Sequence, residues 1–271
     1  ILAGKYIQMD ETTIKVLFVK KDKTHQGYMW VVVDPRTRNT YFEYREGRNR
    51  AGPRLMLKDF QGKVQSDGYV VYDVIDAELS DIDHYNCWTH ARRKFIEALT
   101  DNKAVCEHAL TLIQKLYEVE AGCRNDNCSL DERYERRQTY SLPIMESLKE
   151  WMDQQALVIT PGCPTGKAIA YCNRRWTNLI KYANTGNVEI DNNLVENAIR
   201  PLALGRKNYL FAGGHDAAVN IGYYYTVFST CKAQDVNPYD YALWYLRKIN
   251  NTKITEIDTL TPSAYKKLGE N

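Results

Sequence analysis

The sequence has no long hydrophobic run and no leader-like beginning. No stretch approaches the roughly 18 consecutive apolar residues of a membrane-spanning helix, and the N-terminus lacks a basic region followed by an apolar stretch and a cleavage site. We therefore expect no contact with a membrane and predict a cytoplasmic location. The first residue is Ile1 rather than Met, so we expect the sequence to be a piece of a longer product.

Internal repeats and low-complexity tracts are also absent. Hydrophobic residues make up 44% of the 271 positions, which is enough to build a substantial core. We therefore expect a folded chain of one large domain or two rather than a disordered one.

Cysteine is too scattered for a disulfide framework. The seven cysteines are an odd number spread over a long chain, which fits reduced thiols in a cytoplasm. Cys87 and His90 can be combined with Cys106 and His108 into a set with zinc-ligand chemistry, but the residues between them read as one helix. We do not expect a structural zinc site.

Neither sign of charge dominates the whole chain, since 36 basic and 34 acidic residues give a net charge of +2. The distribution is more informative. Residues 59–86 contain seven acids and one base, whereas residues 154–215 contain seven bases and three acids. A basic surface suits a polyanion, although a solvated helix face is an equally common reason for scattered bases.

The first third of the chain reads as strands. Segments 4–9, 13–20 and 27–34 are rich in Val, Ile, Tyr, Phe and Thr, and polar breaks at Asp10-Glu11 and Asp22-Lys23 predict an antiparallel meander. A helix over 50–60, a short strand leading into Asp67, a helix starting near Tyr69 and a strand over 82–87 are expected next. Strands that alternate with helices after a meander indicate a mixed α/β sheet.

Helices are expected to dominate from Thr89 onward. Ala91, Phe95 and Ala98 form an apolar stripe that predicts the first of them. Further helices are predicted over 103–121, 129–155 and 165–183, from Glu196 to a limit at Pro201, from a cap at Asp216 to 233, and from a cap at Asn237 to 249.

Three carboxylates lie where separate elements are expected to begin or end. Asp10 closes an apolar run, Asp67 follows a short strand and Glu196 begins a helix. Mg2+ takes oxygen ligands and keeps several waters, so a few carboxylates and a phosphate complete its shell. Two such ions, roughly 3.5 to 4 Å apart, hold the attacking and leaving oxygens of an in-line displacement. The constellation indicates metal-dependent chemistry on phosphodiesters.

Each carboxylate also has an ordinary structural interpretation. Neighbours on a strand point to opposite faces, so only one of Asp10 and Glu11 can face a site, and the pair can simply punctuate a hairpin. Asp67 can cap the helix that follows it. Asn193 and Glu196 match a capping box. These alternatives stay open on the sequence alone.

Two segments combine positive charge with aromatic residues. The stretch 87–95 reads Cys-Trp-Thr-His-Ala-Arg-Arg-Lys-Phe, and the stretch 205–214 joins bases, aromatics and glycines. Such segments can contact a nucleic-acid backbone and stack on its bases. The alternative for His90 is a packed histidine at a helix start. The alternative for the stretch 205–214 is a plain hairpin. The predicted DNA-binding residues are His90, Arg92, Arg93, Lys94, Arg174, Arg175, Arg200, Arg206 and Lys207.

Several of these segments, taken in order, resemble the DDE transposases of insertion-sequence family sixty-six, the TnpC type. The matching stretches are Asp10-Glu11-Thr12, Gln65-Ser66-Asp67-Gly68-Tyr69, Cys87 through Phe95, Ile190-Asp191-Asn192-Asn193, Glu196, Arg200-Pro201 and Gly205 through Gly213. They cover almost the whole chain. One departure is Glu196-Asn197, where family members commonly have Glu-Arg, so a cation beside this carboxylate is missing. The amino-terminal zinc-binding and coiled segments of full-length relatives are also missing from the sequence.

The resemblance implies a ribonuclease-H-like α/β fold with a helical insertion before the last catalytic residue. Asp10 and Asp67 are 57 positions apart, while Asp67 and Glu196 are 129 positions apart, which is more than a compact member of this fold needs. The expected organisation is a first part of the core over 1–100, an insertion over 101–188, the remainder of the core over 189–235, and a C-terminal helix and tail over 236–271.

The resemblance also implies a mechanism. Asp10, Asp67 and Glu196 are expected to be the catalytic metal ligands, with Mg2+ as the cofactor and Mn2+ as a substitute. The expected reaction is cleavage of a DNA strand at the transposon ends followed by joining to target DNA, carried out by a homo-oligomer. Two alternatives are a ribonuclease-H-like nuclease or junction resolvase that never joins, and an inactive DNA-binding remnant.

Overall fold

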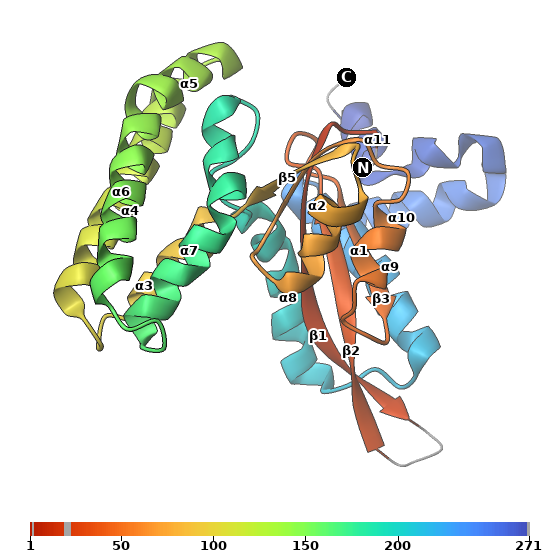
Figure 1. Ribbon diagram of the computed structural model, residues 1–271. Helices are drawn as coiled ribbons and strands as arrows, with labels where there is room; N and C mark the ends of the chain where they lie inside the picture. Colours follow the sequence, from red (N-terminus) through yellow and green to blue (C-terminus); the bar gives the residue numbers. More distant parts are fainter. Residues whose placement is uncertain (2, 19–22, 270–271) are drawn as a thin grey trace. The chain divides into compact units, whose positions relative to one another are not determined.

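The computed structural model describes residues 1, 3–18 and 23–269 (Figure 1). The chain forms two compact units, which we call unit 1 and unit 2. Unit 1 contains Ile1–Gly62 and Asn193–Asn271, and unit 2 contains Lys63–Asn192. The four segments expected from the sequence separate the core from an insertion and a C-terminal tail. This division stays a prediction.

An antiparallel meander forms the sheet of unit 1. Its strands are β1 (Tyr6–Phe18), β2 (Lys23–Val33) and β3 (Thr40–Arg45). β2 lies between the other two and pairs antiparallel with both, and Asp10 of β1 lies opposite Val31 of β2. The expected meander is therefore confirmed, as is the α/β class of the chain.

The extent of the strands differs from the prediction. β1 runs unbroken through Asp10 and Glu11, because both residues pair with β2 and are followed by two threonines that favour an extended backbone. The expected break there is wrong, and Asp10 lies within a strand rather than at its end. β3 is not among the predicted strands. Residues 19–20 of the predicted second strand, and Asp22 of the second break, lie outside the described residues.

The rest of unit 1 is helical. Its helices are α1 (Ala51–Met56), α8 (Asn193–Tyr209), α9 (His215–Ala233), α10 (Pro238–Lys248) and α11 (Pro262–Gly269), with 3-10 turns at Ile249–Asn251 and Ile254–Leu260. α8 and α9 lie alongside the strands (Figure 1). Their apolar residues share a core with alternate residues of β1 and β2, including Ile14, Val31 and Val195.

α8 does not stop before Pro201, and the predicted limit is wrong. The helix continues to Tyr209 with the proline inside it. Proline removes one backbone hydrogen bond, but Val195, Ile199 and Leu202 are buried on both sides of it. This burial against the sheet holds the helix together across the proline.

The two predicted caps near the C-terminus have different outcomes. Asn237 accepts a hydrogen bond from the backbone N–H of Tyr239, with Pro238 as the first residue of α10, as predicted. Asp216 does not precede α9 but lies in its first turn, because the helix already begins at His215. A carboxylate there still interacts favourably with the positive end of the helix.

Unit 2 consists of two neighbouring strands and a set of helices. The strands are β4 (Gly62–Ser66) and β5 (Ile82–Asn86). The helices are a 3-10 turn (Val70–Tyr72), α2 (Asp73–Glu78), α3 (Trp88–Glu97), α4 (Lys103–Asn125), α5 (Leu130–Arg136), a π-helical turn (Arg137–Ser141), α6 (Leu142–Val158), α7 (Pro164–Ile180) and a final 3-10 turn (Lys181–Asn184). These elements follow the predicted order closely.

A buried ion-pair network joins the helices of unit 2. Arg137 and Glu120 are fully buried, and Arg137 Nε and Nη2 donate to the two carboxylate oxygens at 2.7 and 2.9 Å. Arg137 also donates to the backbone carbonyls of Tyr182, Thr185 and Val188. Arg133 pairs with the same carboxylate at 2.6 Å. A single guanidinium thus fixes the course of the segment after α7.

All seven cysteines are free thiols. Cys172 is fully buried on α7, and burial raises the pKa of its thiol to about 12. None of the described helices is both long enough and apolar enough to cross a membrane.

Candidate functional site

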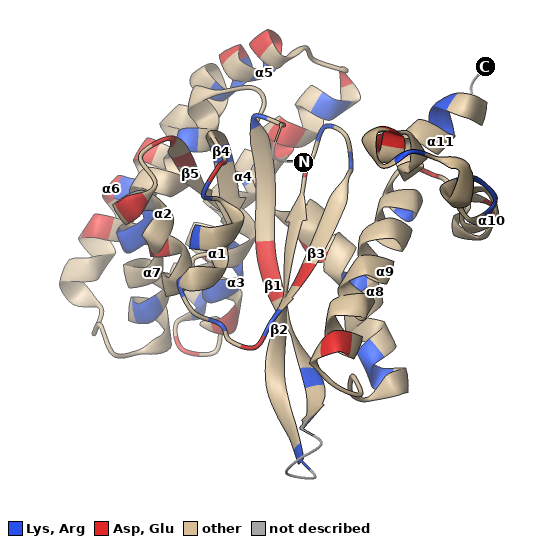
Figure 2. Cartoon of the chain, turned by 90° about the vertical axis from the view of Figure 1, so that its right-hand side faces the viewer, with Lys and Arg blue, Asp and Glu red and all other residues tan. Residues whose placement is uncertain are grey.

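One face of β1 carries Asp10 and lies under α8. Alternate residues of a strand share a face, so Gln8, Asp10, Thr12 and Ile14 point to the same side. Gln8 accepts a hydrogen bond from the backbone N–H of Val195 on α8 at 3.3 Å, and Ile14 is buried in the core that α8 helps to form. Asp10 therefore faces the layer of α8. Figure 2 shows the acidic band of β1 part-way along the strand.

Glu11 belongs to the opposite face of β1. Its buried carboxylate pairs with Arg48 through Nε and Nη2. Asp10 is only partly buried, and its Oδ1 accepts the backbone N–H of Glu11 at 2.8 Å. The two adjacent acids thus have different surroundings, and Asp10 is the one on the side of α8.

Glu196 lies in the first turn of α8, on the same side of the sheet as Asp10. The preceding residue, Val195, is buried and bound to Gln8 through its backbone. The positive end of the helix dipole stabilises a carboxylate in this turn. α8 begins at Asn193, and the capping box between Asn193 and Glu196 stays an alternative interpretation of this carboxylate.

Asp67 belongs to unit 2 and directly follows β4. Its Oδ1 accepts the backbone N–H of Tyr69 at 2.9 Å, and its backbone carbonyl accepts Asn86 Nδ2 at 3.2 Å. The side chain therefore closes a tight turn with Tyr69. The expected helix cap is wrong, because the 3-10 turn over Val70–Tyr72 has Tyr69 as its N-cap and no side-chain cap hydrogen bond. The predicted position at the end of a short strand is confirmed.

Gly68 lets two side chains of α7 pack against the backbone beside Asp67. A Cβ at this position would lie 2.2 Å from Arg175 Nε and 2.3 Å from the Tyr171 hydroxyl. Burial, and then the negative charge of Asp67, raise the pKa of Tyr171 above its ordinary value. The guanidinium of Arg175 lies over the ring of Tyr171, 5.5 Å from its centroid.

These residues border a pocket of about 640 Å³, which we call the α7 pocket. Its lining consists of Gly68, Tyr69, Val70, Asp73, Asn86, Tyr171, Arg174, Arg175, Thr177 and Asn178. Arg174 and Arg175 are among the predicted DNA-binding residues, whereas Tyr171, Asn86 and Asn178 are not. The sequence gives only a weak signal for these three, because Tyr171 and Asn178 on α7 are far in the chain from Asn86 on β5.

A buried histidine organises the strand ends next to this pocket. His84 Nε2 lies 2.8 Å from the Ser66 hydroxyl, and His84 Nδ1 lies 3.4 Å from Asn178 Nδ2. The histidine thus connects β4, β5 and α7. It fixes the end of the strand from which Asp67 projects.

All but the first residue of the stretch 87–95 lies in α3, which has a buried and an exposed side. Trp88 is fully buried and donates Nε1–H to the carbonyl of Leu179 at 3.0 Å. Arg92 and Arg93 are exposed. Lys94 pairs with Glu97 at 2.9 Å, and His90 is partly buried.

The remaining predicted cations also differ in their surroundings. Arg174, Arg200 and Lys207 are exposed. Arg206 Nη1 donates to the Thr12 hydroxyl at 2.9 Å and to the Thr13 carbonyl at 2.6 Å, which attaches α8 to β1. This guanidinium therefore has a structural role that the sequence did not indicate.

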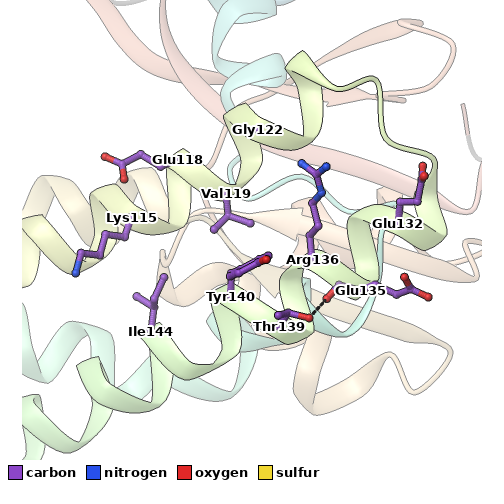
Figure 3. Close-up of a pocket in the computed structure, with 10 residues that line it drawn as sticks. All are labelled: Lys115, Glu118, Val119, Gly122, Glu132, Glu135, Arg136, Thr139, Tyr140 and Ile144. Carbon is purple, nitrogen blue, oxygen red and sulfur yellow. Dashed lines mark hydrogen bonds between the residues drawn. The ribbon is translucent and has the colours of Figure 1, made fainter.

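A second pocket in unit 2, of about 860 Å³, lies between α4 and the helical segment 130–158 (Figure 3). It is lined by Lys115, Glu118, Val119, Gly122, Glu132, Glu135, Arg136, Thr139, Tyr140 and Ile144. Three glutamates outnumber the lysine and the arginine in this lining. The pocket is therefore a poor match for a polyanion, and it contains none of the predicted site residues.

Within the described residues, no group of three or more His, Cys, Asp or Glu side chains is arranged to hold a metal ion. Asp10 and Glu196 belong to unit 1 and Asp67 belongs to unit 2. The shared role of the three carboxylates therefore stays a prediction, as do the predicted DNA contacts.

The family model described as Transposase IS66 family matches residues 1–220, and the chain therefore belongs to this family. The match includes Asp10, Asp67 and Glu196. The chain is 28% identical over 278 residues to the uncharacterized protein y4qI, and 28% identical over 291 residues to the uncharacterized protein y4hP, both of Sinorhizobium fredii. These alignments cover 97% and 98% of the chain but 51% and 52% of the relatives, so the chain spans about half of their length.

Proposed function

We propose that this chain is the catalytic part of a transposase that cuts DNA at the ends of an insertion sequence and joins the cut ends to target DNA. The observation that carries the proposal is the family match over residues 1–220, which includes all three carboxylates. The placement of Asp10 on the face of β1 under α8 supports it, because Glu196 lies in the first turn of α8.

The proposed metal ligands are Asp10, Asp67 and Glu196. Their carboxylates offer the hard oxygen donors that Mg2+ or Mn2+ prefers, and all three residues are partly buried rather than fully enclosed. Bound Mg2+ would polarise the phosphate and lower the pKa of an attacking water. The neighbouring residues position the ligands: Gln8 anchors the first turn of α8, and Asp67 is held by its bond to Tyr69.

Exposed cations are the proposed contacts with the DNA backbone. They are Arg92, Arg93, Arg174, Arg200 and Lys207. Such contacts position the substrate without reading its sequence. His90, Lys94 and Arg175 belong to the same proposal, although Lys94 and Arg175 already pair with an acid of this chain.

The test is strand cleavage and strand transfer with DNA that carries the ends of the insertion sequence. Asp10→Asn, Asp67→Asn and Glu196→Gln are each expected to abolish both reactions, with the far-ultraviolet circular dichroism spectrum unchanged. The matched control is Asp59→Asn, an exposed carboxylate shortly before β4, which should retain activity. Mg2+-dependent cleavage by the Asp10→Asn protein at the original rate would contradict the assignment. Cleavage without joining of pre-cut ends would favour a nuclease.

A further inference from the structure

The α7 pocket begins one residue after Asp67 and combines the groups that recognise a nucleotide. Its lining contains two arginines, two tyrosines and two asparagines, which come from α7, from β5 and from the turn after β4. We infer that this pocket holds a single unstacked nucleotide of the DNA strand, with its phosphate at Arg174 and its base against Tyr69. The inference rests on the proposed function and adds to it a binding subsite beside the proposed metal ligand.

The size of the pocket fits one nucleotide and excludes a duplex. Its volume of about 640 Å³ lies within the range of roughly 300–1,000 Å³ typical of pockets for small ligands. A base that enters it must therefore leave the stack of its neighbours. Enzymes that act on DNA pay such an unstacking cost when contacts within a protein pocket offset it.

The charges in the pocket suit one phosphodiester group. Arg175 Nη1 lies 3.4 Å from Asp73 Oδ1, so an acid of this chain already balances that cation. Arg174 is exposed, and among the described residues it makes no hydrogen bond or ion pair. Among the residues that line the pocket, one positive charge remains unbalanced, and it matches the single negative charge of a phosphodiester.

The aromatic residues are placed to receive a base. Tyr69 is held near Asp67 by its backbone bond to that carboxylate, and its ring is partly exposed. The guanidinium of Arg175 already lies over the Tyr171 ring, so we place the base against Tyr69. Stacking on an aromatic ring accepts every base. The amides of Asn86 and Asn178 already contact Asp67 and His84, so we expect no selection of one base over another.

The first experiment locates the base. A single-stranded oligothymidylate that contains one 5-iododeoxyuridine is bound to the protein, irradiated and digested, and the cross-linked peptide is identified by mass spectrometry. We expect the cross-link at Tyr69, with loss of the product in Tyr69→Leu and its return in Tyr69→Phe. Cross-links that all lie outside the lining of the α7 pocket would overturn the inference.

The second experiment measures affinity for the same oligonucleotide. We expect Arg174→Ala and Tyr69→Leu each to weaken binding by roughly tenfold. Arg124→Ala, which removes an exposed arginine elsewhere in unit 2, should change it by less than about twofold. Equal affinity of the Arg174→Ala, Arg124→Ala and unaltered proteins would overturn the inference. Cleavage of insertion-sequence ends is assayed on the same preparations, so an active protein with no cross-link at the pocket would refute the subsite and leave the proposed function standing.

Discussion

Gln8 and Val195 are joined by a hydrogen bond of 3.3 Å between the side-chain oxygen of the glutamine and the backbone N–H of the valine. Both residues are buried, and they lie 187 positions apart in the chain. The bond fixes the first turn of α8 against β1. It therefore controls the spacing between the strand that carries Asp10 and the turn that carries Glu196.

Replacing Gln8 with leucine should leave the N–H of Val195 without its partner. An unsatisfied buried donor costs about 1–3 kcal/mol, so the free energy of unfolding should fall by that amount in a urea titration. Gln26→Ala is the matched control, because Gln26 is exposed on β2 and should change stability by less than about 0.5 kcal/mol. Equal stability of the two variants would show that the bond to Val195 contributes nothing.

Arg137 is the second residue whose loss should be severe. Replacement with methionine leaves the buried Glu120 carboxylate with less compensation and removes donors from three backbone carbonyls. Breaking a buried pair typically costs about 3–5 kcal/mol, and we expect a loss of this size by denaturant unfolding. Lys149→Ala removes an exposed pair with Asp153 and should cost about 1 kcal/mol at most. A loss no larger than in this control would refute the structural role of Arg137.

The same network predicts a pH dependence. Burial alone would raise the pKa of Glu120, but the bonds and charges of Arg137 and Arg133 hold it below its ordinary value of 4.5. A depressed pKa means that the folded state binds the proton less readily than the unfolded state. The contribution to stability is therefore complete above pH 4.5 and is lost as the pH falls through the lower pKa of the folded protein.

Glu120→Gln tests this dependence. The difference in unfolding free energy between the original protein and the variant should be largest above pH 4.5 and should shrink as the pH is lowered. Denaturant titrations at several pH values measure it. A difference that stays constant down to pH values well below the ordinary pKa would contradict a depressed pKa at Glu120.

Local sequence signals account for much of the fold. The apolar stripe of Ala91 and Phe95 predicts α3, and the pair Asn237-Pro238 predicts the start of α10. The short strand before Asp67 is also predicted from neighbouring residues, because Gly62 ends the preceding helix and Asp67 with Gly68 ends the strand. Each of these signals depends on residues within a turn or two of one another, which is the range that a sequence pattern can report.

The remaining features depend on partners that are distant in the chain. Asp10 stays within a strand because β2 pairs with it, and α8 passes Pro201 because its apolar residues are buried against the sheet. The buried position of Arg137 depends on Glu120, 17 positions away, and on carbonyls at least 45 positions away. At the candidate site, the position of Asp67 directly after β4 was predictable, but the packing of Tyr171 and Arg175 over Gly68 was not.

Gly68 should tolerate no larger side chain. A Cβ there would lie 2.2 Å from Arg175 Nε, so alanine must displace Arg175 and Tyr171 from the backbone beside Asp67. We expect a loss of about 1–3 kcal/mol in stability together with reduced DNA cleavage. Gly162→Ala is the control, because a Cβ at that position meets nothing within 4 Å. Full activity and stability of the Gly68→Ala protein would show that the close packing is not required.

Arg206 and its neighbour Lys207 allow a cation that holds the fold together to be distinguished from a proposed DNA contact. Arg206→Ala removes bonds to the hydroxyl of Thr12 and the carbonyl of Thr13, and hydrogen bonds from charged donors are worth about 1.5–3 kcal/mol. The unfolding free energy of the Arg206→Ala protein should fall by that amount, while the dependence of its DNA affinity on salt should be unchanged.

Lys207 is exposed, so Lys207→Ala should leave stability within about 0.5 kcal/mol. If Lys207 contacts a phosphate, the slope of log affinity against log salt should fall by about 1 in this variant, because one fewer counterion is released. Binding measured at several salt concentrations, beside urea unfolding of the same proteins, distinguishes the two roles. The opposite pattern, a reduced slope with unchanged stability for Arg206→Ala, would make Arg206 the phosphate contact and its bonds to β1 dispensable.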